Sequence, residues 1–86
     1  MEIILSPKAQ QDLKHWKLSG NVKIQKKISE LLNVISSTPF TGIGKSEALK
    51  HDYSGCWSRR INEEHRLIYE VQADVINILS LKDHYI

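Results

Sequence analysis

Three arginines lie close together in the middle of the second half of the chain, and a histidine follows near its end: Arg59, Arg60, Arg66 and His84. The guanidinium group of arginine presents a planar fork of donors that suits phosphate oxygens, which lysine or threonine would not match. Histidine titrates near neutral pH and can give or take a proton. These residue types indicate chemistry at a phosphate group, provided that the fold brings them together.

Strand patterning predicts how these side chains are placed. The segment SGCWSRRINEEHRLIYE reads as a β-hairpin, and alternate residues of a strand share one face of a sheet. If Trp57 and Leu67 mark a face covered by helices, then Arg60, Arg66 and His84 are expected on the open face. Three such groups repel one another unless an anion lies between them. The pattern therefore favours a phosphate site on the open face.

The rest of the chain predicts the elements that hold this hairpin. We expect a strand at 2–5, helices at 7–18 and 22–35, and a three-stranded meander with turns at 62–64 and 73–74. The last strand, VINILSLKDHY, would place Ser80, Lys82 and His84 on one side. The glycine-containing connection 38–55 is long for a small domain, which favours a functional role. The predicted class is α+β with the order β-α-α-β-β-β.

Composition limits the alternatives. A chain of 86 residues is expected to form a single domain, residues 1–86. Its net charge of +2 excludes a protein that binds nucleic acid by charge alone, so any basic surface must be local. A single cysteine, Cys56, excludes an internal disulfide and fits a reducing compartment. With no signal peptide or membrane span apparent in the sequence, a cytoplasmic location is expected.

Two stretches of the chain carry a resemblance to a known family. The segment GIGKSEALKHDYSGCWSRRINEEHRLIYEV and the later HY resemble the YoeB-type (Txe/YoeB) toxins of the RelE superfamily. The resemblance implies a RelE-like, microbial-RNase-like fold, with a helix hairpin on one face of a largely antiparallel sheet. It implies the toxin of a type II toxin-antitoxin system, an endoribonuclease that cleaves mRNA in the ribosomal A site. The implied products carry 2',3'-cyclic phosphate and 5'-hydroxyl ends.

The resemblance also implies roles and partners. Glu47 is implied as general base, Arg66 as the phosphate-stabilising group and His84 as general acid, although base and acid could be exchanged. Substrate contacts are implied for Lys50, Arg60 and Tyr85. RNA cleavage by its own 2'-hydroxyl needs these three catalytic roles and no metal, so neither metal nor cofactor is expected. The implied partners are mRNA, the ribosome and a cognate antitoxin with a disordered segment that folds on binding, and a homodimer remains open.

Other interpretations stand beside these. The turn residues Arg59, Arg60, Glu63 and Glu64 could form a solvated salt-bridge network. His15, His51 and His65 with Asp52 could suggest a metal cluster, which the absence of a ligand spacing disfavours. Trp16 and Trp57 are expected in the core. The chain could also be a non-catalytic ribosome-, RNA- or antitoxin-binding relative that represses its own operon.

Four positions depart from the family pattern, and one of them, Cys56, replaces an aromatic residue before Trp57 and is expected to serve packing. Ser46 stands where proline usually precedes the base, which would hold Glu47 less firmly. Asp83 stands where an aromatic residue or glycine is usual, and its carboxylate could raise the pKa of His84. Ile86 follows the tyrosine that commonly ends these chains. Activity could be lower if Glu47 is held less firmly.

Overall fold

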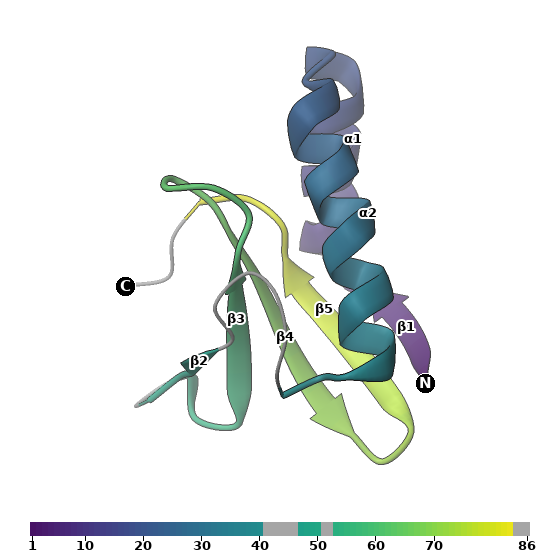
Figure 1. The fold of residues 1–86 in the computed structure, drawn as a ribbon, viewed down its shortest axis with the longest axis vertical. Coiled ribbons are helices and arrows are strands. Elements are labelled where there is room, and N and C mark those ends of the chain that lie inside the picture. The colour runs from purple at the N-terminus through teal and green to yellow at the C-terminus, as the bar shows by residue number, and fades with distance from the viewer. Residues whose placement is uncertain (41–46, 51–52, 84–86) are drawn as a thin grey trace.

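The computed structural model describes residues 1–40, 47–50 and 53–83. Its elements are β1 (Glu2–Leu5), α1 (Pro7–Ser19), α2 (Val22–Ser37), β2 (Glu47–Ala48), β3 (Cys56–Arg60), β4 (Arg66–Gln72) and β5 (Val75–Ser80). The strands of these residues form one sheet, and the two helices lie side by side as a hairpin against one of its faces (Figure 1). The predicted α+β class is confirmed, and the predicted element order gains one short strand, β2.

The sheet is mixed, with the order β1-β5-β4-β3-β2. β1 runs parallel to β5, and the other neighbouring strands are antiparallel. The predicted hairpin is β3–β4, in which Trp57 lies opposite Tyr69. The predicted turn between β4 and β5 is also present, and Ala73 adopts a left-handed φ of 52° there. This arrangement places β4, the strand that carries Arg66, in the centre of the sheet.

The helices begin and end where the sequence places their caps. The Ala9 N–H donates to Ser6 Oγ at 3.0 Å, with Pro7 as the first residue of α1. Gly20 ends α1 in a left-handed conformation with φ 73°, which glycine adopts without steric cost. Asn21 then caps α2 by accepting the Ile24 N–H at 3.1 Å. The two predicted helices are confirmed, one residue longer in α1 and two in α2.

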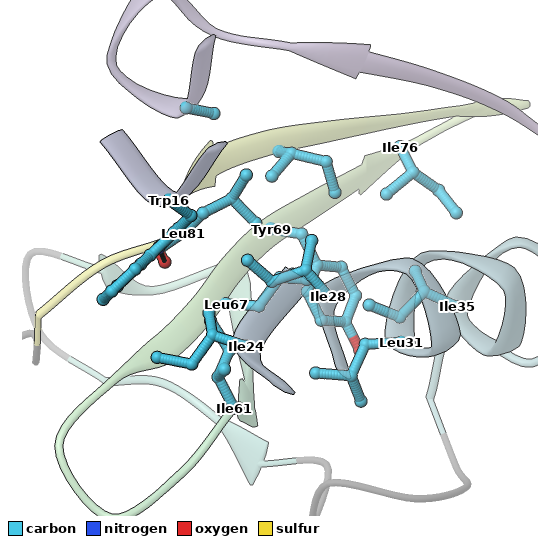
Figure 2. Close-up of a cluster of buried hydrophobic side chains, with 12 residues drawn as sticks. Trp16, Ile24, Ile28, Leu31, Ile35, Ile61, Leu67, Tyr69, Ile76 and Leu81 are labelled. Carbon is cyan, nitrogen blue, oxygen red and sulfur yellow. Dashed lines mark hydrogen bonds between the residues drawn. The ribbon is translucent and has the colours of Figure 1, made fainter. Parts of the chain in front are cut away.

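The main core lies between the helix hairpin and the sheet (Figure 2). Its fully buried side chains come from both helices and from β4 and β5: Ala9, Leu31, Ile35, Leu67, Tyr69, Ile76 and Ile78. Trp16 is buried and Trp57 packs against the same cluster, as expected. Each large side chain buried here contributes about 1.5–3 kcal/mol of transfer free energy. On β3 and β4 the residues that face this core are odd-numbered, such as Trp57, Leu67 and Tyr69. Because side chains alternate along a strand, the even-numbered residues lie on the opposite, open face.

The open face carries a small apolar cluster of its own. Leu49, Cys56 and Ile68 are buried there, and Leu79 packs against them. Leu49 follows β2, and its N–H donates to the Cys56 carbonyl at 3.0 Å. The segment predicted as an irregular connection thus returns to the sheet as a two-residue edge strand, anchored by one leucine.

The end of β5 corrects one prediction. The β4–β5 register places Ile68 opposite Ser80 but Tyr69 opposite Ile78, so Leu79 is an extra residue that interrupts the alternation. β5 ends at Ser80, because the Leu81 N–H donates to Asp12 Oδ2 of α1 at 3.0 Å instead of to a neighbouring strand. The prediction that the last strand continues beyond Ser80, with Ser80, Lys82 and His84 on one side, is therefore wrong for residues 81–83, the last ones that the structure describes.

Candidate active site on the open face

Arg60 and Arg66 meet on the open face as predicted. They are directly opposite each other in the β3–β4 register, where Cβ atoms lie about 5 Å apart. Arg60 is exposed and Arg66 is half-buried. Within the described residues neither guanidinium forms an ion pair with a carboxylate. Two like charges therefore face each other across neighbouring strands, an arrangement that an anion would stabilise.

The side chain of Arg66 is also held by the turn that joins β3 and β4. Its Nη1 donates to the carbonyls of Asn62 at 2.6 Å, His65 at 3.1 Å and Glu63 at 3.3 Å. Asn62 Oδ1 in turn accepts the N–H groups of Glu64 and His65, at 2.9 and 2.8 Å. In the described residues the Nε and Nη2 groups of Arg66 donate no hydrogen bond. One edge of the guanidinium is fixed, and the other can approach a phosphate oxygen.

Arg59 has a different role from its neighbour. It is fully buried on the helix side of β3. Its Nη2 donates to the Thr38 carbonyl at 2.6 Å and its Nε to Tyr69 Oη at 3.2 Å, and the Tyr69 hydroxyl donates to the Pro39 carbonyl. Arg59 thus holds the end of α2 against the sheet. The solvated salt-bridge network considered for the turn is wrong, since Arg59 and Arg60 form no ion pair with Glu63 or Glu64 in the described chain.

Glu47 and Lys50 lie on either side of the buried Leu49 anchor. Glu47 is exposed and sits opposite Ser58 of β3, so it shares the open face with Arg60 and Arg66. Strand spacing and rise put the Cα atoms of Glu47 and Arg66 about 12 Å apart, a gap that two long side chains and a phosphate can bridge. Lys50 is also exposed, and its carbonyl accepts the Tyr53 N–H at 3.2 Å.

A hollow of about 270 Å³ lies at the β4–β5 side of the open face. Ile68 and Leu79 give it apolar lining, and Tyr53, Lys8 and Lys82 also contribute side chains. Lys8 donates to Asp12 Oδ2 at 2.7 Å and Lys82 contacts the Asp83 carboxylate at 3.3 Å, so both lysine charges are partly neutralised. The hollow is suited to a flat group with polar edges more than to a second isolated phosphate.

Several predicted positions lie outside the described residues. These are His84 and Tyr85 of the expected site, Ser46 and Ile86 among the departures, and His51 and Asp52 of the metal alternative. The described residues contain no group of three or more histidine, cysteine, aspartate or glutamate side chains that could hold a metal. Among those same residues no helix has the length and apolar character needed to cross a membrane.

Sequence reasoning missed Asp12, and it considered His65 only as part of a metal cluster. Asp12 is 8% exposed, and its carboxylate accepts the Lys8 ammonium and the Leu81 N–H. Its position on the apolar stripe of α1, between Ala9 and Trp16, is the signal that could have identified it. His65 Nδ1 accepts the Asp83 N–H at 2.8 Å, a contact between distant segments that the hairpin pattern gives no means of predicting.

Comparison with known proteins finds relatives from one family that match nearly the whole chain. The family described as "YoeB-like toxin of bacterial type II toxin-antitoxin system" matches residues 5–85. Toxin YoeB of Escherichia coli K12 is 46% identical over 85 residues, covering 99% of this chain and 100% of that protein.

Solved structures agree with this match. A YoeB/ParE toxin from Agrobacterium tumefaciens superposes with a TM-score of 0.94 at 33% identity, over 99% of this chain and 100% of that one. The toxin in a YoeB-YefM complex from Staphylococcus aureus gives 0.88 at 46% identity, over 99% and 98% of the two chains. A YoeB dimer from the same organism has also been solved.

Proposed function

Because the chain belongs to the YoeB-like toxins of bacterial type II toxin-antitoxin systems, we propose that it is an endoribonuclease that cleaves messenger RNA in the ribosomal A site. The observation that carries this proposal is the pair Arg60–Arg66, two cations opposite each other on the open face with no carboxylate partner in the described chain. Glu47 on the neighbouring edge strand supplies a carboxylate on the same face.

The reaction divides among these residues as follows. Glu47 takes the proton of the 2'-hydroxyl, and the resulting oxygen attacks the adjacent phosphorus. Arg66 and Arg60 stabilise the extra negative charge of the pentacoordinate phosphorane. The bond to the 5'-oxygen then breaks, and His84 gives that oxygen a proton. The products are a 2',3'-cyclic phosphate and a 5'-hydroxyl, and no bond-making step calls for a metal ion.

Two features of the site support this division. The Nη1 edge of Arg66 is fixed by three turn carbonyls, which leaves Nε and Nη2 as a preoriented pair of donors for phosphate oxygens. Such preorganisation lowers the cost of reorganising donors during the reaction. The hollow lined by Tyr53 and Ile68 lies beside this point and offers an aromatic and apolar surface for an unstacked base. Lys50 and Tyr85 complete the proposed substrate contacts.

The proposed partners follow from the same family. The S. aureus relative is solved both with YefM and as a dimer, so we expect this chain to bind a cognate antitoxin and to self-associate. An antitoxin segment that folds on binding would cover the charged open face and block access to RNA. The site of action is the cytoplasm, where ribosomes translate messages.

The test is cleavage of a defined message on programmed ribosomes, with the chemistry of the new ends determined. We expect 5'-hydroxyl ends, and 5'-phosphate ends would contradict the mechanism. His84→Gln keeps approximate size but cannot deliver a proton, so it should slow single-turnover cleavage by roughly 10²- to 10⁴-fold. Its affinity for ribosomes should change little. Binding by the wild type with no cleavage would favour the non-catalytic alternative.

A further inference from the structure

The residues directly before His84 are held in place although they form no strand. Leu81 is fixed at both backbone polar groups by α1: its N–H donates to Asp12 Oδ2 at 3.0 Å, and its carbonyl accepts Trp16 Nε1–H at 2.9 Å. The Lys82 carbonyl accepts the Ser80 hydroxyl at 3.0 Å. The chain therefore leaves β5 along a path set by helix side chains.

Asp83 is fixed at both ends by the turn of the β3–β4 hairpin. Its N–H donates to His65 Nδ1 at 2.8 Å, and its carbonyl accepts the Arg66 N–H at 3.0 Å. Asp83 has a φ of 68°, a left-handed conformation that a non-glycine residue keeps only where surrounding contacts hold it. The two hydrogen bonds supply such contacts, and they tie residue 83 to the strand that carries Arg66.

The His65 ring is itself well supported. Its side chain is 14% exposed, and its ring meets that of Trp16 edge to face with centroids 4.8 Å apart. Trp16 is the same residue whose indole N–H binds the Leu81 carbonyl. The His65 Nδ1 faces the Asp83 N–H and accepts that hydrogen bond. One histidine thus joins the helix layer, the hairpin turn and the segment that leads to His84.

We propose that His65 is a positioning residue, which sets the place of His84 by holding the Asp83 peptide against the Arg66 strand. This inference rests on the proposed function, because it assigns to His65 an effect on the proton donor of that reaction. An error of about 1 Å in the position of a catalytic group can cost as much as 10²-fold in rate. The loss of the hydrogen-bond acceptor at His65 Nδ1 is therefore expected to lower the cleavage rate measurably.

Two substitutions separate this role from ordinary support of the fold. His65→Phe keeps a ring against Trp16 but has no acceptor for the Asp83 N–H. His65→Asn loses the ring but places a carbonyl oxygen near the position of Nδ1. We expect His65→Phe to stay close to wild type in thermal stability and to cleave roughly 10- to 10²-fold more slowly on programmed ribosomes. His65→Asn should be less stable and yet cleave faster than His65→Phe.

A double mutant identifies the route of the effect. If His65 acts through His84, then adding His65→Phe to His84→Gln should slow cleavage by less than twofold beyond His84→Gln alone. Equal slowing in both backgrounds would overturn the inference, as would wild-type rates for His65→Phe or rates that simply follow stability. Absence of cleavage by the wild-type protein would instead remove the proposed function and the positioning role together.

Discussion

At the scale of single residues, Arg59 and Arg60 make a matched pair of neighbours with opposite roles. Arg59→Met removes two hydrogen bonds, those that Arg59 donates to the Thr38 carbonyl and to the buried Tyr69 Oη. We expect a loss of about 1–3 kcal/mol in the free energy of unfolding. Arg60 is exposed, so Arg60→Met should change that free energy by less than about 0.5 kcal/mol.

The rate of RNA cleavage should be affected in the reverse order, more by Arg60→Met than by Arg59→Met. Arg60→Met is expected to slow cleavage on programmed ribosomes by about 10²-fold, the cost of removing one donor to developing negative charge. Arg59→Met should cleave at nearly the wild-type rate per folded molecule. Urea unfolding and single-turnover cleavage of both variants make the comparison. A stability loss in Arg60→Met equal to that in Arg59→Met would contradict the division of roles.

Sequence patterning predicted only part of these residue roles. Strand parity separates Arg59 from Arg60 and puts Arg66 on the same face as Arg60, because alternation is a local property of the backbone. Their directly opposite register comes from the structure. What Arg59 binds is a carbonyl at the end of α2, 21 residues away in the sequence. The Asp83–His65 bond likewise joins residues 18 apart, through a tail that leaves the strand pattern. Contacts of this kind depend on the packed fold and have no sequence period.

At the scale of elements, the short strand β2 decides where Glu47 and Lys50 lie. Leu49, 5% exposed, anchors this strand in the open-face cluster with Cys56 and Ile68. We expect Leu49→Ala to cost about 2–3 kcal/mol in unfolding free energy, near the lower end for buried leucines because the edge segment can relax. Cleavage per folded molecule should fall at least tenfold, since Glu47, the proposed general base, would lose its alignment.

Two controls make the Leu49 result specific. Leu49→Met conserves volume and apolar character, so stability and cleavage should stay near wild type. Leu31→Ala removes a fully buried side chain of the main core, a different cluster from the one that holds Leu49. It should destabilise the protein at least as much while leaving the cleavage rate per folded molecule unchanged. Equal loss of rate in Leu31→Ala and Leu49→Ala would show that β2 has no separate role.

The elements differ in how well the sequence predicts them. Both helices follow from caps and apolar spacing, since these signals repeat over many residues. β2 has two residues, too few for any alternation to appear. The end of β5 was missed because Asp12, on another element, binds the N–H that would have continued the strand. Short strands and strand ends are set by such tertiary hydrogen bonds.

At the scale of the whole molecule, the two-layer architecture concentrates charge locally. The helix hairpin covers one face of the sheet, and Arg60, Arg66 and Glu47 all lie on the other. A net charge of +2 is thereby compatible with a locally cationic surface. The same open face also holds the cluster around Cys56, so the stability of the fold depends on the ionisation of that thiol.

Cys56 gives a whole-molecule prediction for alkaline pH. Burial, and secondarily the negative charge of Glu70 opposite it, raise the pKa of the Cys56 thiol. The folded protein therefore keeps this proton at pH values where the unfolded chain, with a thiol pKa of about 8.5, loses it. The contribution of the protonated Cys56 thiol to the free energy of unfolding is fully present below the pKa of the unfolded thiol. It is lost as the pH rises through the higher pKa of the folded thiol.

The measurement is urea unfolding of wild type and Cys56→Ala at pH values from about 7 to 10. Cys56→Ala should begin less stable because it loses buried volume, but its free energy of unfolding should fall less steeply above about pH 8.5. Glu70→Gln removes the smaller cause of the shift, so its slope should lie between the two. Parallel curves for wild type and Cys56→Ala would mean that the thiol titrates alike in both states, and the alkaline loss of stability would then belong to other groups.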